Sequence, residues 1–366
     1  MKPDADNNQI RRTARYSQIL LASCLVMIVL HLWGATKPFH ENWGVHLFAF
    51  YPSWICGIAL IVSLSLFIPA VRATIGRKVA KLAQGSSRIP GPIIFLTIGG
   101  VTVLLSNLFP ARINLLGDSD LILSLTPQNP GVQDISANFR NQPLTYYAIR
   151  AVQYVLGGGS SVDVGYTYQI LDEAAGLLFI SLLLFFLHFL KISPLEKLLI
   201  GGYVFLQTSL QFFFGYVENY ALLSVLMMAF MITGWLALEK ELHPIYAIIS
   251  FALMIGLHLG SIIFLPAPLI LLYQIWRERR VQAGLLALGG ILGSALFFHL
   301  SNYSLEQFIR RIESGIQNDM LPFFKTYPAG PYAMFSGLHL IDWTNACLFL
   351  ISFGCFLVPV LFYFSA

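Results

Sequence analysis

Long apolar runs recur along nearly the whole chain, and they limit what it can fold into. Each is roughly 17–25 residues long, enough for a helix to cross about 30 Å of hydrocarbon. Apolar residues make up 57% of the 366 residues and charged residues only 11%, far from the even mix of a soluble domain. The chain is therefore predicted to be an all-α polytopic membrane protein.

The apolar runs predict about ten membrane helices. We expect them near residues 18–35, 45–70, 92–110, 168–190, 197–214, 219–238, 244–258, 260–276, 281–300 and 338–364. Three regions follow from this order. They are a cytoplasmic N-terminus with a membrane hairpin over residues 1–91, a membrane core over residues 92–300, and an outer loop with a final helix over residues 301–366.

A large polar loop over residues 111–165 lies inside the predicted membrane core. Within it, residues 142–157 have apolar side chains at helical spacing, with Arg150 and Gln153 on the opposite face. This pattern predicts a short helix in the plane of the membrane interface.

The basic residues indicate how the helices are oriented. With the N-terminus inside, 15 of the 22 Lys and Arg residues lie on the cytoplasmic side, including runs at 11–15, 72–88 and 277–280. Cytoplasmic loops carry such an excess. We therefore expect a multi-pass protein of the inner (plasma) membrane with a cytoplasmic N-terminus. The non-cytoplasmic side then gathers the loop 111–165, the tips at 216–219 and 258–261, and the loop 301–337.

Asp118 and Asp120 are the first candidates for chemistry. They follow the third predicted helix, two residues apart, so an extended backbone points both carboxylates the same way. Such a pair either binds a divalent cation, Mg²⁺ or Mn²⁺, through oxygen ligands or provides a general base and a group that orients it. The alternative is a polar turn that starts the following segment.

Other acids lie near the non-cytoplasmic helix ends. Glu218 and Asn219 stand between two strongly apolar helices, where an acid is costly without a function or a partner. The alternative for Glu218 is an acid that favours the start of the next helix. Asp172 and Glu173 lie at the outer end of the fourth predicted helix, where interfacial solvation explains them as well as a role does.

His258 and three cations complete the candidate set. His258 lies between Gly256 and Gly260, small residues that allow a helix or a ligand to approach; the alternative is a hydrogen-bonded packing residue. The cations of the last large loop stand among aromatic residues, which suits either a lipid phosphate head group or interfacial anchoring. They are Arg310, Arg311 and Lys325.

Several protein classes are excluded by missing motifs. The chain has no GxxxxGK[ST], HExxH, GxSxG or CxxC sequence, which argues against a P-loop, zincin, serine-hydrolase or thiol-redox protein. The basic residues form topology signals rather than one patch, so we expect no nucleic-acid partner.

The arrangement resembles the GT-C superfamily of polytopic glycosyltransferases. The resemblance covers about residues 92–300, seven helices, and rests on an acidic outer loop with Asp-x-Asp, an interfacial helix and a run of often short helices. It implies a polyprenyl-phosphate sugar as donor and partner. Asp118 and Asp120 would take the place of the acidic pair, Glu218 would be a second acid, and His258 would lie near the donor head group. Residues 141–144 read Asn-Gln-Pro-Leu where members often have a His-Pro-Pro element, so the acceptor stays open.

The resulting hypothesis is a transferase that acts on the non-cytoplasmic face. Asp118, Asp120 and Glu218 would be catalytic, and Asn219, His258 and the three cations would hold the donor phosphate. The main alternative is a proton- or ion-coupled secondary transporter, which predicts acids near the bilayer midplane and repeated halves. A membrane scaffold that assembles through its loops is the third.

Overall fold

The computed structural model describes residues 3–38, 45–49, 51–86, 88–108, 122–124, 126, 139–158, 160–205, 213–215, 217–278, 280–302, 304, 306–307, 309–310 and 336–350. All regular structure in these residues is helical, and no strand occurs among them. The all-α prediction is confirmed for this part of the chain.

The chain divides into two compact units. The first comprises residues 1–88, 193–209 and 312–366, and the second comprises residues 89–192 and 210–311. The second unit covers most of the expected membrane core. The three-part division that the sequence indicates stays a prediction.

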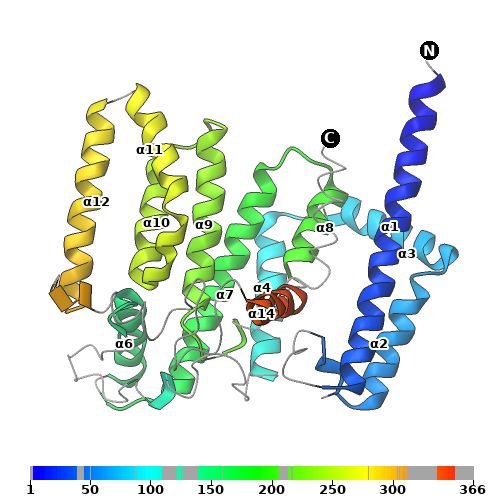
Figure 1. Cartoon of the computed structure of the whole chain (residues 1–366), viewed down its shortest axis with the longest axis horizontal. Coiled ribbons are helices and arrows are strands. Elements are labelled where there is room, and N and C mark those ends of the chain that lie inside the picture. The colour runs from blue at the N-terminus through cyan, green and yellow to red at the C-terminus, as the bar shows by residue number, and fades with distance from the viewer. Residues whose placement is uncertain are drawn as a thin grey trace. The chain divides into compact units, whose positions relative to one another are not determined.

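The first unit begins with α1 (Pro3–Thr36), a single helix of 34 residues (Figure 1). The short 3-10 segment η2 (Leu47–Ala49) packs against it. The unit also holds α2 (Ser53–Ser65), α3 (Pro69–Ser86), α8 (Pro194–Phe205) and α14 (Gly337–Leu350). Within this unit, α8 packs on α3.

A sharp corner separates α2 from α3. The sequence predicts one span over residues 45–70, but α2 has 13 residues and the axis of α3 is turned from it by 91°. Arg72 stabilises the corner, because its Nη1 donates to the carbonyl oxygens of Leu66 and Phe67 at 2.9 and 3.0 Å. These carbonyls follow the last turn of α2, where a helix leaves acceptors without intrahelical donors.

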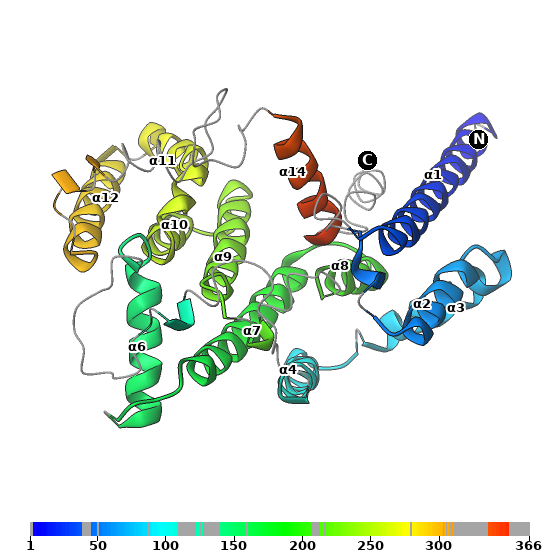
Figure 2. The ribbon, with the colours of Figure 1, turned by 60° about the horizontal axis from the view of Figure 1, so that its bottom comes forward.

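The second unit is a row of packed helices (Figure 2). α4 (Gly91–Leu108) packs on α7 (Val164–Phe189), α7 on α9 (Ala221–Leu238), and α9 on α10 (Ile245–Leu257). α11 (Pro266–Glu278) and α12 (Arg280–Leu300) pack on each other and on α10. α6 (Pro143–Gly157) contacts both α7 and α10. The helix predicted over residues 142–157 is therefore present as α6.

Four described helices are long and apolar enough to cross a membrane, namely α4, α7, α9 and α12, and the bent pair α2 and α3 would make a fifth. These helices support a membrane protein. The ten predicted spans are not confirmed by the described residues, because α8 and α10 have only 12 and 13 residues. The span expected over residues 260–276 is divided into η5 (Leu259–Phe264) and α11. Proline lacks a backbone N–H and suits the first position of a helix, so α11 begins at Pro266.

The described helices place apolar side chains outward and several polar ones inward. Large exposed apolar residues include Leu96, Leu104, Leu178, Phe185, Leu285 and Ile291. Buried polar residues include Thr102, Ser106, Thr167 and Asp172. Soluble proteins seldom expose continuous apolar surface of this kind, so lipid is the environment that fits these helix faces.

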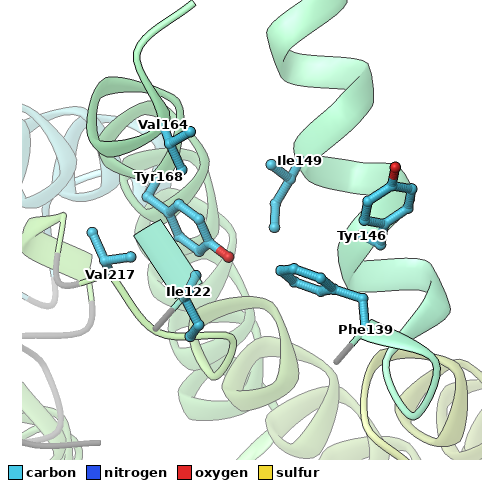
Figure 3. Packing of buried hydrophobic residues seen from close by; sticks show 7 residues of the cluster. All are labelled: Ile122, Phe139, Tyr146, Ile149, Val164, Tyr168 and Val217. Atoms are coloured by element: carbon cyan, nitrogen blue, oxygen red, sulfur yellow. The ribbon is translucent and has the colours of Figure 1, made fainter. Parts of the chain in front are cut away.

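An apolar cluster attaches α6 to α7 (Figure 3). Phe139 and Tyr146 pack with their ring centroids 5.5 Å apart, and the cluster also draws in the chain just before α9. Its members are Ile122, Phe139, Tyr146, Ile149, Val164, Tyr168 and Val217. Parts of the outer loop predicted over residues 111–165 therefore fold back onto α7.

Candidate functional site

Several polar contacts between helices of the second unit lie where α6 meets the carboxyl ends of α10 and α12, and we call this the α6 end. Thr145 of α6 donates to the Leu257 carbonyl at the carboxyl end of α10, at 2.9 Å. Tyr147 of α6 donates to the Leu300 carbonyl at the end of α12, at 3.2 Å. The carboxyl ends of α10 and α12 thus meet α6 at the same end.

Glu173 ties the carboxyl end of α4 to this end of α7. Its Oε1 accepts hydrogen bonds from Ser106 Oγ at 2.7 Å, Asn107 Nδ2 at 3.0 Å and Gln169 Nε2 at 3.3 Å. Ser106 and Asn107 belong to the last turn of α4, which ends at Leu108. Asp118 and Asp120 themselves lie outside the described residues.

The segment before α9 runs along α7. A Cβ on Gly176 would lie 2.9 Å from Phe213 Cβ. Gly215 has φ +74°, and a Cβ there would lie 3.2 Å from Gln169 Cα. Positive φ is open to glycine and strained for other residues, so Gly215 allows the segment to turn against α7.

Glu218 and Asn219 are buried at the end of this segment. Glu218 is 6% exposed and Asn219 8%. Tyr168 of α7 donates to Asn219 Oδ1 at 2.7 Å, and this contact is buried. The N-cap of α9 is Tyr220, whose side chain makes no capping hydrogen bond. Glu218 is thus a buried acid just before α9, and both the functional role and the role at the helix start stay predictions.

Asp172 is the polar residue whose surroundings the sequence interpretation missed. It is 1% exposed, and neither carboxylate oxygen has a hydrogen-bond partner among the described residues. Interfacial solvation is therefore wrong for Asp172. A signal was present in the sequence, because Asp172 shares a helical face with the buried Tyr168, Ala175 and Gly176. A buried, unpartnered carboxylate is costly and points to a function.

The polar face of α6 is turned inward. Arg150 and Gln153 are buried, and Arg150 Nη1 donates to Gln153 Oε1 at 2.8 Å. Tyr154 and Val155 are 66% and 79% exposed. A helix that divides protein core from water would show the reverse arrangement, so the outer face of α6 suits contact with lipid.

His258 lies at the carboxyl end of α10, beside the segment that carries Glu218. Its Nδ1 accepts a hydrogen bond from the Gly260 backbone N–H at 3.0 Å, and its ring centroid lies 5.8 Å from that of Tyr220. Burial lowers the pKa of His258 below its ordinary value. The neutral imidazole is favoured, since protonated Nδ1 cannot accept this bond. The close approach expected beside His258 is made by α6, because a Cβ on Gly256 would clash with Leu144.

Only Arg310 of the three predicted cations lies within the described residues, so their grouping stays a prediction. Arg310 is exposed and its Nη2 pairs with Glu306 at 2.5 Å, one helical turn away. Arg311 and Lys325 lie outside the described residues. Exposed pairs of this kind contribute little to stability, so the Arg310 guanidinium can exchange Glu306 for an anionic ligand.

No group of three His, Cys, Asp or Glu side chains among the described residues could hold a metal ion. The Mg²⁺ or Mn²⁺ hypothesis rests on Asp118 and Asp120, which fall outside those residues. It stays a prediction.

The chain was compared with protein-family models, curated proteins and solved structures, and none of them matches it. Similarity therefore assigns no family. The α6 end is the site from which function can be inferred, because the segment with Glu218 and Asn219 contacts α7 through Tyr168 and contacts His258 through Tyr220.

Proposed function

We propose that this chain is a membrane glycosyltransferase that moves a sugar from a polyprenyl-phosphate donor to an acceptor hydroxyl. The observation that supports it is a buried acid, Glu218, at the α6 end, next to Asn219 and to the Tyr220 ring that contacts His258. Asp118 and Asp120, the proposed base, follow α4 in the sequence and lie outside the described residues. A transferase of this class needs acids at the water-accessible end of a membrane-embedded helix bundle.

The proposed reaction is a single displacement with inversion. Asp118 or Asp120 takes the proton from the acceptor hydroxyl as the acceptor oxygen forms a bond to the anomeric carbon. The bond from that carbon to the phosphate oxygen breaks, and its electron pair leaves on the phosphate. No covalent enzyme intermediate forms.

The leaving phosphate needs countercharge rather than a proton, because it is already a stable anion. Arg310, Arg311 and Lys325 would supply it, or a divalent cation held by Asp118 and Asp120. Arg310 fits this role because its partner Glu306 is exposed and can be displaced.

Glu218 would act on the sugar rather than on the phosphate. The transition state has oxocarbenium character, and a nearby carboxylate stabilises the positive charge that develops. Asn219 is positioned by Tyr168, and burial lowers the pKa of His258, which favours its neutral form. Both would offer uncharged hydrogen-bonding groups to the donor head group.

The proposal includes the membrane arrangement that the sequence predicts. About ten spans would surround a GT-C-like core over residues 92–300, with α6 in the interface plane and the α6 end on the non-cytoplasmic face of the inner (plasma) membrane. The exposed Tyr154 and Val155 of α6 support an approach from the lipid phase for a donor with a polyprenyl chain.

A secondary transporter is the second candidate, and Asp172 favours it. This residue lies eight positions into α7, which is long and apolar enough to span a membrane. Acids buried within spans mark proton and ion pathways in transporters. The two candidates differ in what the purified protein must bind.

Donor binding separates the two candidates. The full chain in lipid nanodiscs is titrated with a short-chain polyprenyl-phosphate sugar, and with the matching polyprenol as a control that lacks phosphate and sugar. The proposal predicts saturable binding of the first compound only. The protein would instead be a transporter if it bound no donor and showed proton-coupled flux in proteoliposomes. That flux should then be lost in Asp172→Asn.

A further inference from the structure

α3 carries a concentrated positive charge on one exposed helix of the first unit. It contains four basic residues and no acid over its 18 residues. Arg72 is engaged by the carbonyl oxygens at the end of α2. The other three, Arg77, Lys78 and Lys81, are exposed.

A narrow apolar stripe runs beside these cations. Val71, Ile75, Val79 and Leu82 recur at helical spacing on α3. Ile75 and Leu82 are 42% and 62% exposed. The inner edge of the helix is held in place, because Ala83 is buried and α3 packs on α8. The helix therefore keeps apolar side chains outside its protein contact.

The corner with α2 sets the direction of α3. α2 has no buried residue and exposes Trp54, Ile58 and Ile61, as a lipid-facing helix does. α3 leaves it at 91°, and its length is about 27 Å. A helix at right angles to one that enters the bilayer lies along the membrane plane. Four cations also make α3 too costly as a spanning helix.

We propose that α3 is an in-plane helix that binds an anionic phospholipid surface. Ile75 and Leu82 enter the boundary between head groups and acyl chains, and Arg77, Lys78 and Lys81 pair with lipid phosphates. Amphipathic helices with cations beside an apolar stripe bind such surfaces through burial of the apolar side chains and through attraction of the cations to lipid phosphates. The site is separate from the α6 end, so it holds whether or not the protein transfers sugars.

Lipid retention tests the charge contribution. The full chain is purified from nanodiscs of phosphatidylcholine with phosphatidylglycerol, and the lipids that stay bound are counted by native mass spectrometry. The variant Arg77→Gln, Lys78→Gln, Lys81→Gln should lose its preference for phosphatidylglycerol by about tenfold, since each cation near an anionic surface contributes to binding. The matched variant Lys240→Gln, Arg277→Gln, Arg280→Gln changes exposed cations of the second unit and should keep it. If both variants retained the same amount of phosphatidylglycerol, the proposal would be overturned.

Depth measurements test the position of the helix. A fluorophore is attached at Leu82→Cys or at Ala73→Cys, on the opposite side of α3, in a protein whose four cysteines are replaced by serine. Lipids brominated on their acyl chains should quench the probe at position 82 and spare the probe at position 73. Quenching at both positions would make α3 part of a bent span, and quenching at neither would place it in water; both results contradict the proposal.

Discussion

Asp172 and Glu173 are neighbours in α7 with opposite surroundings. Glu173 Oε1 accepts three hydrogen bonds, from Ser106, Asn107 and Gln169. Both oxygens of Asp172 are buried without a hydrogen-bond partner among the described residues. One carboxylate therefore joins two helices, and its neighbour is retained at a cost in stability.

Removing the two carboxylates should change stability in opposite directions. Asp172→Leu keeps the shape of the side chain and removes the buried carboxyl group that lacks hydrogen-bond partners, so it should raise the free energy of unfolding by about 1–3 kcal/mol. Glu173→Met removes an acceptor from three donors and should lower it by about 1–3 kcal/mol. Denaturant unfolding in detergent, followed by tryptophan fluorescence, measures both. A destabilised Asp172→Leu protein would show that Asp172 has a partner.

The Tyr168 hydroxyl should contribute measurably to the fold. Tyr168→Phe leaves Asn219 Oδ1 buried without its donor, which should cost about 1–2 kcal/mol of unfolding free energy. Tyr166→Phe, at a half-exposed ring on the same helix, is the matched control and should change little. The same unfolding assay compares them, and equal effects would count against a specific role for the contact.

Gly215 should resist substitution in a way that Gly234 does not. Gly215→Ala places a methyl group 3.2 Å from Gln169 at φ +74° and should cost about 1–2 kcal/mol. Gly234 lies in α9, and a Cβ there meets nothing within 4 Å. Gly234→Ala should therefore stabilise the protein by about 0.5–1 kcal/mol. Midpoints of thermal unfolding should move in opposite directions; a tolerant Gly215 would show that the segment before α9 can adopt another path.

His258 should make the folded protein less stable as the pH falls. Burial lowers its pKa in the folded protein, so the unfolded chain binds more protons as the pH falls below about 6.5. Folding stability is then complete above that pH and declines as the pH falls further, until the folded-state pKa is reached. Native protein should lose more unfolding free energy between about pH 7.5 and pH 5 than His258→Asn. Parallel pH profiles would contradict a neutral, buried imidazole.

Hydropathy located the long apolar helices, because a helix that faces lipid must have an apolar sequence. α4, α7, α9 and α12 lie where the sequence predicts spans. The corner after Ser65 was not predicted, because it depends on Arg72 reaching back to the carbonyls of Leu66 and Phe67. The division of residues 259–278 was also missed, although Pro266 marks the place where α11 begins.

The candidate site was predictable in part from the alternation of apolar runs and basic loops. The predicted topology placed Glu218 and His258 on the same side of the membrane, and the structure brings their segments into contact through Tyr220. Asp172 was misjudged because distance along a helix from its end does not show which face is buried. That face depends on residues 213–215 and 217–220, which pack on α7 where Phe213 meets Gly176 and where Gly215 meets Gln169.

Sugar transfer by the aspartate variants tests the central claim most directly. Purified full chain in proteoliposomes is given a radiolabelled polyprenyl-phosphate sugar and a panel of hydroxyl acceptors, and release of polyprenyl phosphate is measured. We predict turnover by the native protein, and a loss of about 100-fold or more in Asp118→Asn or Asp120→Asn, as expected when a general base is removed. Full turnover by both variants would remove the proposed base and contradict the account.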